Sequence, residues 1–347
     1  MRLHSYPRLA SSASDFTSTS PPRYEGHGAR DDPLRGPRHA PATLTDERPK
    51  PLVPLDHKPL AAFALDLLAD AGVLHVVANA HHLAEQVDPG LRPYADRRGV
   101  SLTTLVEREL LGTGGGIRNA LPHLGDGDFI VFNGDVLARP DLSAALAHHR
   151  RLGARMTLVL RHHPDADRLG AIEVDDEGRV RRALDEGPAP EVPVRRCVFT
   201  GVYVMSTSVA PLLPEEGCVV RRTLRALLAS GEPVGGVVDG GPWFDLGTVG
   251  RYAEAQFALL RGELPWPGRS PTPGAVSVAP DAVIDEGVTV GPEVIVGAGA
   301  RVRGRGALSR AVVWDGADVE LPCEGTVVGR RSRAVIPPRE ATLDGPK

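Results

Sequence analysis

The sequence predicts an α/β domain followed by a repetitive β module. Two observations carry this prediction. Apolar strand and helix patterns alternate after Leu44, and an aliphatic residue recurs at every sixth position near the C-terminus. The chain has 347 residues, which is enough for two domains with their own apolar cores.

The N-terminal segment differs in composition from the rest. Residues 1–43 are rich in Ser, Pro, Arg and His and show hardly any apolar periodicity. Such a segment cannot bury enough apolar surface to offset the entropy lost on ordering, so we expect it to be disordered. The expected organisation is this segment, an α/β domain over 44–263, a Pro/Gly-rich linker at 264–275, a β module over 276–335 and a tail at 336–347.

Helices and strands alternate at short intervals in the first half of the domain. Helical apolar spacing over 59–72 ends at Gly72, and further helices are expected over 81–98 and 142–153. Apolar strands are expected at 73–80, 100–107, 129–135 and 155–161. This alternation predicts a doubly wound sheet of parallel strands, in which ligands bind at the carboxyl ends of the strands.

From about residue 171 the pattern is typical of hairpins. The stretch "GAIEVDDEGRVRRAL" predicts two short strands around a turn at Asp176–Gly178. The stretch "CVFTGVYVM" predicts a further apolar strand, and helices are expected near 219–230 and 248–262.

An internal repeat follows the Pro/Gly-rich linker. The aliphatic residues spaced six apart are Val278, Ile284, Val290, Val296, Val302 and Leu308. A period of six is neither helical nor a simple strand alternation, and it is the signature of a parallel β-helix that stacks these residues inward. The alternative is an irregular sheet rich in Val and Gly.

Composition excludes several classes of function. The net charge of −4 gives no reason to expect binding to nucleic acid or to an anionic membrane. No apolar run approaches the length of a transmembrane helix. Cys197, Cys218 and Cys323 lie far apart and show no zinc-site spacing, which favours a reducing, cytoplasmic environment.

Lys50 stands between Pro49 and Pro51 in "TDERPKPLVP". Flanking prolines fix φ and stiffen the backbone, which suits a cation that must meet a phosphate with little loss of entropy. The alternative is an ordinary solvated surface lysine.

A glycine cluster lies in "LLGTGGGIRNA", where Gly112, Thr113 and Gly114–Gly116 precede an expected helix. Glycines permit close approach of the backbone and leave N–H groups free for a ligand. The alternative is a flexible turn.

Two aspartates follow apolar stretches. Asp135, after Gly134, ends the strand in "FNGD", and Asp245 lies in "WFDLGT". A carboxylate at the end of a strand can hold Mg²⁺ together with substrate phosphates. The alternatives are a turn residue for Asp135 and a helix N-cap for Asp245.

In this order, "LTDERPKPLVP", "GTGGG", "FNGD", "FTGVYV", "WFDLGT" and the hexapeptide repeats resemble the sugar-1-phosphate nucleotidylyltransferase family over about 44–335. The resemblance implies a Rossmann-like, doubly wound mixed sheet followed by a left-handed parallel β-helix. It implies the reaction of an NTP with a sugar 1-phosphate to give an NDP-sugar and pyrophosphate. The wording is most similar to bacterial mannose-1-phosphate guanylyltransferases and the related N-acetylmuramate-1-phosphate uridylyltransferases, which favours GTP and mannose 1-phosphate.

The same resemblance implies a role for each candidate residue. Lys50 would lie near the reacting phosphates, and Asp135 and Asp245 would be the Mg²⁺ ligands. The residues implied to bind the nucleotide are Gly112, Thr113, Gly114, Gly115, Gly116 and Gly134, and those implied to bind the sugar are Glu186, Thr200 and Gly201. The β-helix would make the protein a homo-oligomer or regulate it.

Two departures from the family pattern stand out. The family's E-K-P motif is "EGP" here, so Gly187 replaces the lysine expected at the sugar phosphate. The phosphate loop G-x-G-T-R-x-x-P is absent before "LT", as is the first strand of the sheet. Poor catalysis is therefore expected of this chain, and a noncatalytic paralogue that binds sugar nucleotides is the alternative function.

The missing loop is compatible with a shifted reading frame. Read from the second base, the degenerate codons of 36–43 allow GLGTRLRP, and those of 25–30 allow the apolar strand KAMVLA. Residues 31–35 do not fit this pattern. We therefore expect residues 1–43 to be a frameshifted reading.

A hexapeptide acyltransferase is a third possible function. Those enzymes commonly use a histidine general base, and residues 276–347 contain no histidine.

Overall fold

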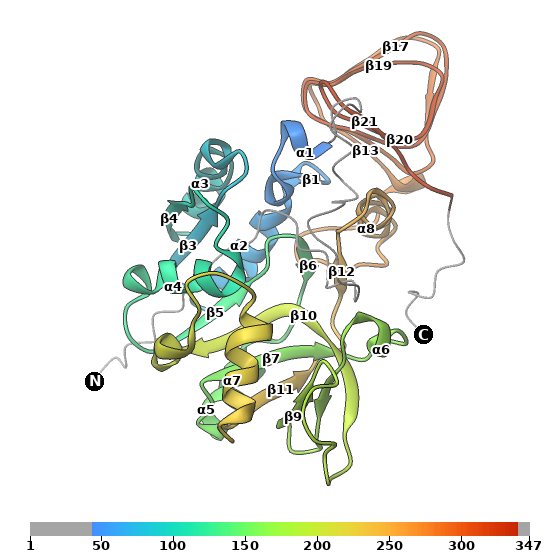
Figure 1. The fold of residues 1–347 in the computed structure, drawn as a ribbon. Coiled ribbons are helices and arrows are strands. Elements are labelled where there is room, and N and C mark those ends of the chain that lie inside the picture. Colours follow the sequence, from blue (N-terminus) through green and yellow to red (C-terminus); the bar gives the residue numbers. More distant parts are fainter. Residues whose placement is uncertain (1–43, 339–347) are drawn as a thin grey trace, which may run out of the picture. The chain divides into compact units, whose positions relative to one another are not determined.

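The computed structural model describes residues 44–338 of the chain (Figure 1). The expected disorder and shifted frame of 1–43 lie outside these residues, as does most of the expected tail. The described residues divide into two compact units, Ala61–Trp243 and Leu44–Leu60 together with the chain from Phe244 onward. This division cuts across the expected bounds 44–263 and 276–335, which stay a prediction.

The first unit is built on a mixed sheet. Its strands are β5 (Asp128–Phe132), β7 (Met156–Arg161), β8 (Ile172–Val174), β9 (Val180–Ala183), β10 (Arg195–Ser206) and β11 (Val234–Val238). Strand β10 runs antiparallel to β5, β7 and β8, whereas β11 runs parallel to β7. The mixed sheet that the family resemblance implies is therefore confirmed, and the parallel pairing expected from the strand–helix alternation does not extend to β10. The chain reaches β10 from the β8–β9 hairpin rather than through a helical crossover, which parallel pairing requires.

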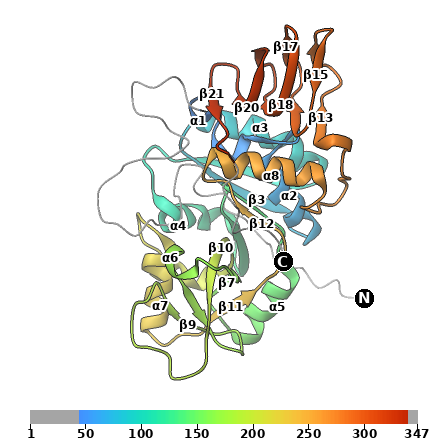
Figure 2. The same cartoon turned by 90° about the vertical axis from the view of Figure 1, so that its right-hand side faces the viewer.

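A second, two-stranded sheet in this unit consists of the parallel strands β3 (His75–Ala80) and β4 (Ser101–Val106). The helices of the unit are α2 (Leu60–Asp70), α3 (Val87–Arg97), α4 (Gly112–Leu124), α5 (Leu142–Leu152), α6 (Ala166–Leu169) and α7 (Arg225–Ala229). Helix α3 begins later than expected because Leu83 is left-handed, with φ 49°, and a 3₁₀ turn follows it. Helix α5 packs against β7, β10 and β11 (Figure 2).

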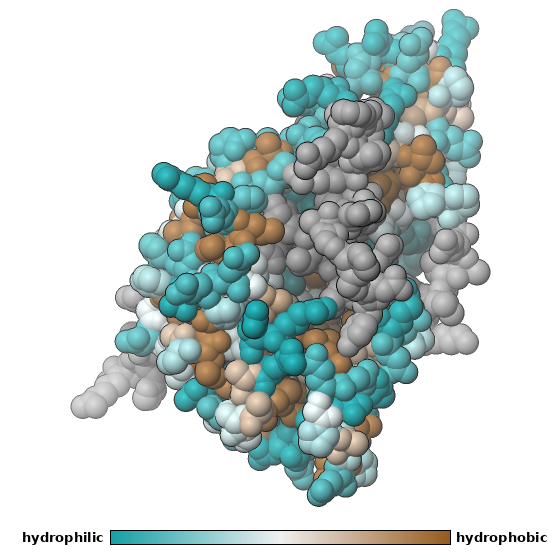
Figure 3. Space-filling view, viewed as in Figure 1, coloured by the Kyte–Doolittle hydropathy of each residue, from teal (hydrophilic) through white to brown (hydrophobic). Residues whose placement is uncertain are grey.

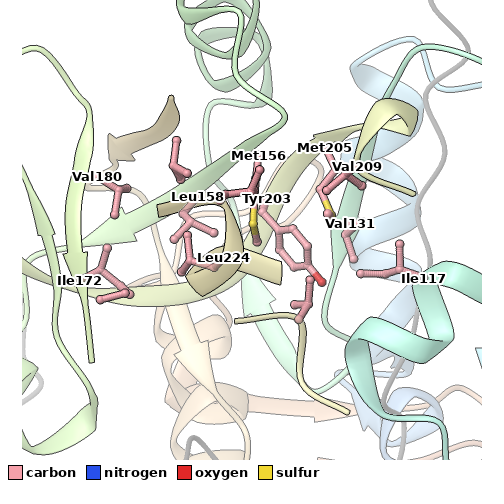
Figure 4. Close-up of a cluster of buried hydrophobic side chains, with 14 of the residues drawn as sticks. Ile117, Val131, Met156, Leu158, Ile172, Val180, Tyr203, Met205, Val209 and Leu224 are labelled. Atoms are coloured by element: carbon pink, nitrogen blue, oxygen red, sulfur yellow. The ribbon is translucent and has the colours of Figure 1, made fainter. Parts of the chain in front are cut away.

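One apolar core joins these elements. Val131 of β5 and Ile117 of α4 belong to the same cluster as Tyr203 of β10 and Leu224 (Figure 4). Val77 of β3 belongs to it as well. Tyr203 is fully buried. The strands of both sheets and helix α4 therefore contribute side chains to one apolar core.

The second unit combines the N-terminal segment of the described chain with its C-terminal part. It begins with α1 (Leu44–Glu47), a 3₁₀ turn (Lys50–Leu52) and the hairpin of β1 (Pro54–Leu55) and β2 (Lys58–Pro59). Strand β12 (Trp243–Asp245) carries the chain back into this unit, and α8 (Val249–Arg261) follows. Thr248 is the N-cap of α8, and its side chain accepts a hydrogen bond from the N–H of Arg251.

The remaining strands of this unit form what we call the C-terminal strand module, Val276–Val335. They are β13 (Val276–Val278), β14 (Val283–Ile284), β15 (Val288–Val290), β16 (Val294–Val296), β17 (Arg301–Arg303), β18 (Gly306–Val313), β19 (Asp318–Glu320), β20 (Cys323–Val328) and β21 (Arg333–Val335). Val276 pairs in parallel with Val294, and Val294 with Ala311. On a second sheet β14, β17 and β19 pair in parallel in the same way.

The residues spaced six apart mostly face the core of this module. Val296, Val302 and Leu308 are fully buried together, and Ile284 and Val290 pack against them. Val278 pairs in parallel with the buried Val296 and so lies on the same face of the sheet, but it is 39% exposed. It lies on β13, the edge strand of its sheet.

Hydrophilic side chains cover much of the face drawn in Figure 3, and apolar ones are scattered among them. In the part of the chain that the structure describes, none of the helices is both long and apolar enough to cross a membrane.

Replacing Leu308 by alanine should lower the free energy of unfolding by about 2–5 kcal/mol, because it leaves a cavity in a packed core. The matched control is Val335→Ala, at a side chain that is 77% exposed, which should change stability by less than about 0.5 kcal/mol. Urea denaturation followed by tryptophan fluorescence measures both. Equal midpoints for the two variants would contradict the assignment of Leu308 to the core.

Candidate active site

Lys50 lies at the start of the 3₁₀ turn, directly after Pro49. Its side chain is buried, with 3% of the residue exposed. The alternative of a solvated surface lysine is therefore wrong. Pro49 and Pro51 fix φ on either side, so the ammonium group is held by a stiff backbone.

Asp245 ends β12 and is 8% exposed. Its Oδ1 accepts the N–H of Gly247 at 2.9 Å, and its Oδ2 pairs with Arg251 Nη1 at 2.7 Å. Thr248, not Asp245, caps α8, so the N-cap alternative is wrong. The carboxylate is instead fixed by its own turn and by a cation one turn into the helix.

Asp135 lies in the first unit, between β5 and β6 (Val136–Ala138), and is 6% exposed. In the same loop the Asn133 N–H donates to the carbonyl of Gly201 at 2.9 Å. Gly201 has φ 84°, and a Cβ there would lie 3.2 Å from Asn133, so a glycine is required at this irregularity of β10. The structure thus brings the "FNGD" loop and the expected sugar residue Gly201 together.

Gly134 also lines an apolar cavity. The other lining residues come from α2, α3, β3, β4 and the end of β5, and include Ala64, Val76 and Phe132. This cavity adjoins the loop expected to contact the nucleotide.

Thr200 is buried and held on both sides. Its Oγ1 donates to the carbonyl of Val159 at 2.8 Å, and its own carbonyl accepts the indole N–H of Trp243 at 2.9 Å. These contacts fix the backbone of β10 next to Gly201, where the chain departs from regular strand pairing.

Glu186 lies in a tight turn after β9, where Leu184 and Asp185 have positive φ. Its carboxylate pairs with the guanidinium of Arg225, at the start of α7. A hydrogen bond from Arg196 lowers the pKa of the neighbouring Asp185. The turn that carries Gly187 therefore already holds an arginine close to the position where the family pattern has a lysine.

The glycine cluster lies within the first turns of α4 rather than ahead of the helix. The N–H of Gly114 donates to the carbonyl of Gly217 at 2.7 Å, so it is not free for a ligand as expected. A Cβ on Gly115 would lie 2.3 Å from the carbonyl oxygen of Glu215. The Thr113 hydroxyl accepts the N–H of Val219 at 2.8 Å. Close packing of two backbones is thus the reason for these glycines.

Sequence reasoning missed a buried carboxylate beside this cluster. Glu107 is 7% exposed and follows β4. Its Oε1 accepts from Asn79 Nδ2 at 2.7 Å, and its Oε2 accepts the N–H of Leu111 at 3.3 Å. Asn79 also donates to the carbonyl of Gly116 at 3.0 Å. The signal was an acidic residue at the carboxyl end of a strand, five positions before Gly112.

Comparison with known proteins places this geometry in a family. The Nucleotidyl transferase family model matches residues 36–262. A mannose-1-phosphate guanylyltransferase of Mycobacterium tuberculosis is 32% identical over 83% of this chain and 80% of that protein. The chain belongs to the sugar-1-phosphate nucleotidylyltransferase family. A UTP–glucose-1-phosphate uridylyltransferase of Synechocystis sp. is 30% identical over 66% of this chain and 62% of that protein.

Solved structures support the nucleotidyltransferase fold. The crystal structure of HddC from Yersinia pseudotuberculosis matches with a TM-score of 0.53 and 21% identity, covering 72% of this chain and 97% of that one. A structure of HddC complexed with GMP-PN matches with a TM-score of 0.52 and 20% identity over the same shares.

Each of the two expected Mg²⁺ ligands is a buried carboxylate, Asp135 in the first unit and Asp245 in the second. Across residues 44–338, no group of three or more His, Cys, Asp or Glu side chains is arranged to hold a metal ion. Mg²⁺ commonly takes one or two carboxylates and completes its shell with water and substrate phosphates. The buried carboxylates Asp135 and Asp245 are donors of that kind.

Substituting Gly115 by alanine should destabilise the protein by about 1–3 kcal/mol, because the new methyl group overlaps the Glu215 carbonyl. Gly240→Ala is the control, since a Cβ at Gly240 meets no atom within 4 Å. Thermal unfolding of both variants measures the difference. Equal melting temperatures would show that the α4 backbone does not pack closely against residues 214–217.

Proposed function

We propose that the protein transfers a guanylyl group from GTP to mannose 1-phosphate, giving GDP-mannose and pyrophosphate. The observation that carries this proposal is the buried carboxylate of Glu107 beside the glycine cluster of α4, the segment that the family resemblance assigns to the nucleotide base. The mannose-1-phosphate guanylyltransferase of Mycobacterium tuberculosis supports the choice of both substrates.

A fixed carboxylate favours guanine over the pyrimidine bases. Guanine presents two neighbouring donors, N1–H and N2–H₂, which match the two oxygens of one carboxylate. Uracil presents a single N–H between two carbonyl oxygens, whose lone pairs a carboxylate would repel. Asn79 and the N–H of Leu111 hold Glu107 in place and leave each of its oxygens further acceptor capacity.

Positioning and charge neutralisation would account for the reaction. The phosphate of the sugar attacks the α-phosphorus in line, and pyrophosphate leaves, so the protein has little covalent chemistry to perform. Lys50 would bring its ammonium group to the reacting phosphates. Asp135 and Asp245 would hold Mg²⁺, which neutralises phosphate charge when bound.

The sugar would be bound around β10. Glu186 would accept a hydrogen bond from a sugar hydroxyl. The rigid backbone at Thr200 and Gly201 would line the sugar pocket. Gly187 cannot supply the cation of the family's E-K-P motif. Arg225, already paired with Glu186, would supply that charge.

The phosphate loop absent from the sequence limits the rate expected of this chain. Restoring the shifted frame upstream of Leu44 would supply the arginine and backbone N–H groups of that loop. We also propose that the protein acts in the cytoplasm, consistent with its three free cysteines, and that the C-terminal strand module is a left-handed β-helix through which the protein forms a homo-oligomer.

A screen of four NTPs against mannose, glucose and N-acetylhexosamine 1-phosphates should give the highest kcat/KM for GTP with mannose 1-phosphate. Pyrophosphate release is the readout, and EDTA should abolish it until Mg²⁺ is restored. The same assay on a chain with the frame restored should give a higher kcat. A different preferred pair would contradict the substrate assignment, and saturable binding of GDP-mannose without turnover would identify a noncatalytic protein.

Glu107→Gln should lower kcat/KM for GTP roughly 5- to 150-fold, since a lost bidentate contact is worth about 1–3 kcal/mol. Turnover of UTP should fall less or rise. Glu109→Gln removes the same charge from an exposed residue two positions away and should leave both values unchanged. An equal loss for GTP and UTP would show that Glu107 does not select the base.

A further inference from the structure

We propose that the C-terminal strand module is the rigid support of the Lys50 segment, by which we mean residues 47–54. Glu47 and Arg48 attach this segment to the module rather than bind substrate. This inference rests on the proposed function, in which Lys50 meets the reacting phosphates. All the contacts that carry it lie within the second unit.

Glu47 fastens the upstream side of Lys50. Its Oε1 accepts the N–H of Arg330 at 2.9 Å, and its Oε2 accepts the N–H of Arg331 at 2.8 Å. One carboxylate thus accepts hydrogen bonds from two consecutive backbone N–H groups of the loop between β20 and β21. Such charge-assisted hydrogen bonds are strong. The approach is so close that a Cβ on Gly329 would lie 2.0 Å from Glu47 Oε1.

Arg48 adds a second contact with the module. Its Nη1 lies 3.3 Å from Asp315 Oδ2, and its guanidinium lies over the Trp314 ring at 5.3 Å from the centroid. Trp314 is 1% exposed. A cation above a buried aromatic face is held more tightly than a solvated one.

Trp314 also reaches the downstream side of Lys50. Its indole N–H donates to the hydroxyl of Tyr252 at 3.0 Å, and this hydroxyl donates to the carbonyl of Pro54 at 2.6 Å. Gln256 donates to the same carbonyl at 2.6 Å and accepts the N–H of Asp56 at 2.8 Å. The module is therefore joined to both ends of the segment, directly through Glu47 and Arg48 and through α8 at Pro54.

Lys50 lies between these two sets of anchors, two residues after Arg48 and four before Pro54. Three prolines, Pro49, Pro51 and Pro54, limit the backbone between them. Small displacements of a positioned group are costly, on the order of 100-fold in rate for about 1 Å. Loss of an anchor in the module should thus act on Lys50, at a distance from the chemistry.

The sequence makes this directly measurable, because it contains only three lysines, Lys50, Lys58 and Lys347. The experiment labels the native protein with a dilute acetylating reagent and follows each lysine by peptide mass mapping. Lys347 is the internal reference, because Lys58 lies in the hairpin that the same anchors hold. In the same preparations, pyrophosphate release gives kcat and KM. The anchor variants are Asp315→Asn, Trp314→Phe and Tyr252→Phe.

The control is Asp318→Asn, which removes an exposed ion pair with Arg303 in the same module. In the anchor variants we expect Lys50 to be labelled about tenfold faster relative to Lys347, because the segment opens locally more often. We expect kcat to fall roughly 10- to 100-fold with a smaller change in KM. The control should match the wild type in both, and Arg48→Gln combined with Asp315→Asn should cost no more than Arg48→Gln alone.

Wild-type labelling of Lys50 in all the anchor variants would overturn the docking. Faster labelling with unchanged kcat would overturn the positioning role. A wild-type protein that releases no pyrophosphate would refute the proposed function instead, and the labelling alone would then decide whether the module holds the segment. Asp315→Asn keeps an oxygen acceptor for the N–H of Ala298, so it is the variant least disturbing to the module's own fold.

Discussion

The carbonyl of Pro54 accepts hydrogen bonds from two buried side chains of α8, and the second unit is organised around it. Proline has no backbone N–H, so the carbonyl is the one backbone group of Pro54 that can form a hydrogen bond. Tyr252 and Gln256 are almost wholly buried, and a buried polar group without a partner is costly. Each of these groups therefore fixes the others, and burial raises the pKa of the Tyr252 hydroxyl above its usual value.

That constraint explains how distant parts of the sequence form one unit. Residues 44–60 have too few apolar side chains to build a core of their own. They are held instead by hydrogen bonds from α8 at Pro54 and by contacts of Glu47 and Arg48 with the C-terminal strand module. The hairpin turn at Asp56 and His57 has two positive φ values, and contacts from Gln256 and Arg269 hold it in this conformation.

Local patterns predicted most elements well, since α2, β3, β4, α5 and β7 follow apolar periodicity along single stretches of chain. The mixed direction of β10 was beyond such patterns, because strand direction depends on how the chain returns to the sheet. At the site, the burial of Lys50 and the role of Glu107 depend on partners far along the chain. The sequence shows the glycine cluster, but it does not show that the backbone of residues 214–217 packs against it. The expectation that its N–H groups are free was therefore wrong for Gly114.

The stretch "LTDERPKPLVP" therefore serves two purposes that a motif alone does not separate. Glu47, Arg48 and Pro54 make contacts with the rest of their unit, and Lys50 is the residue that we propose meets the phosphates. A lysine is held in position when its neighbours bind a rigid partner through their own polar groups. Here Glu47 and Arg48 bind the C-terminal strand module in this way. Truncating the module should therefore impair the reaction even in a protein that still folds, because the geometry of Lys50 depends on it.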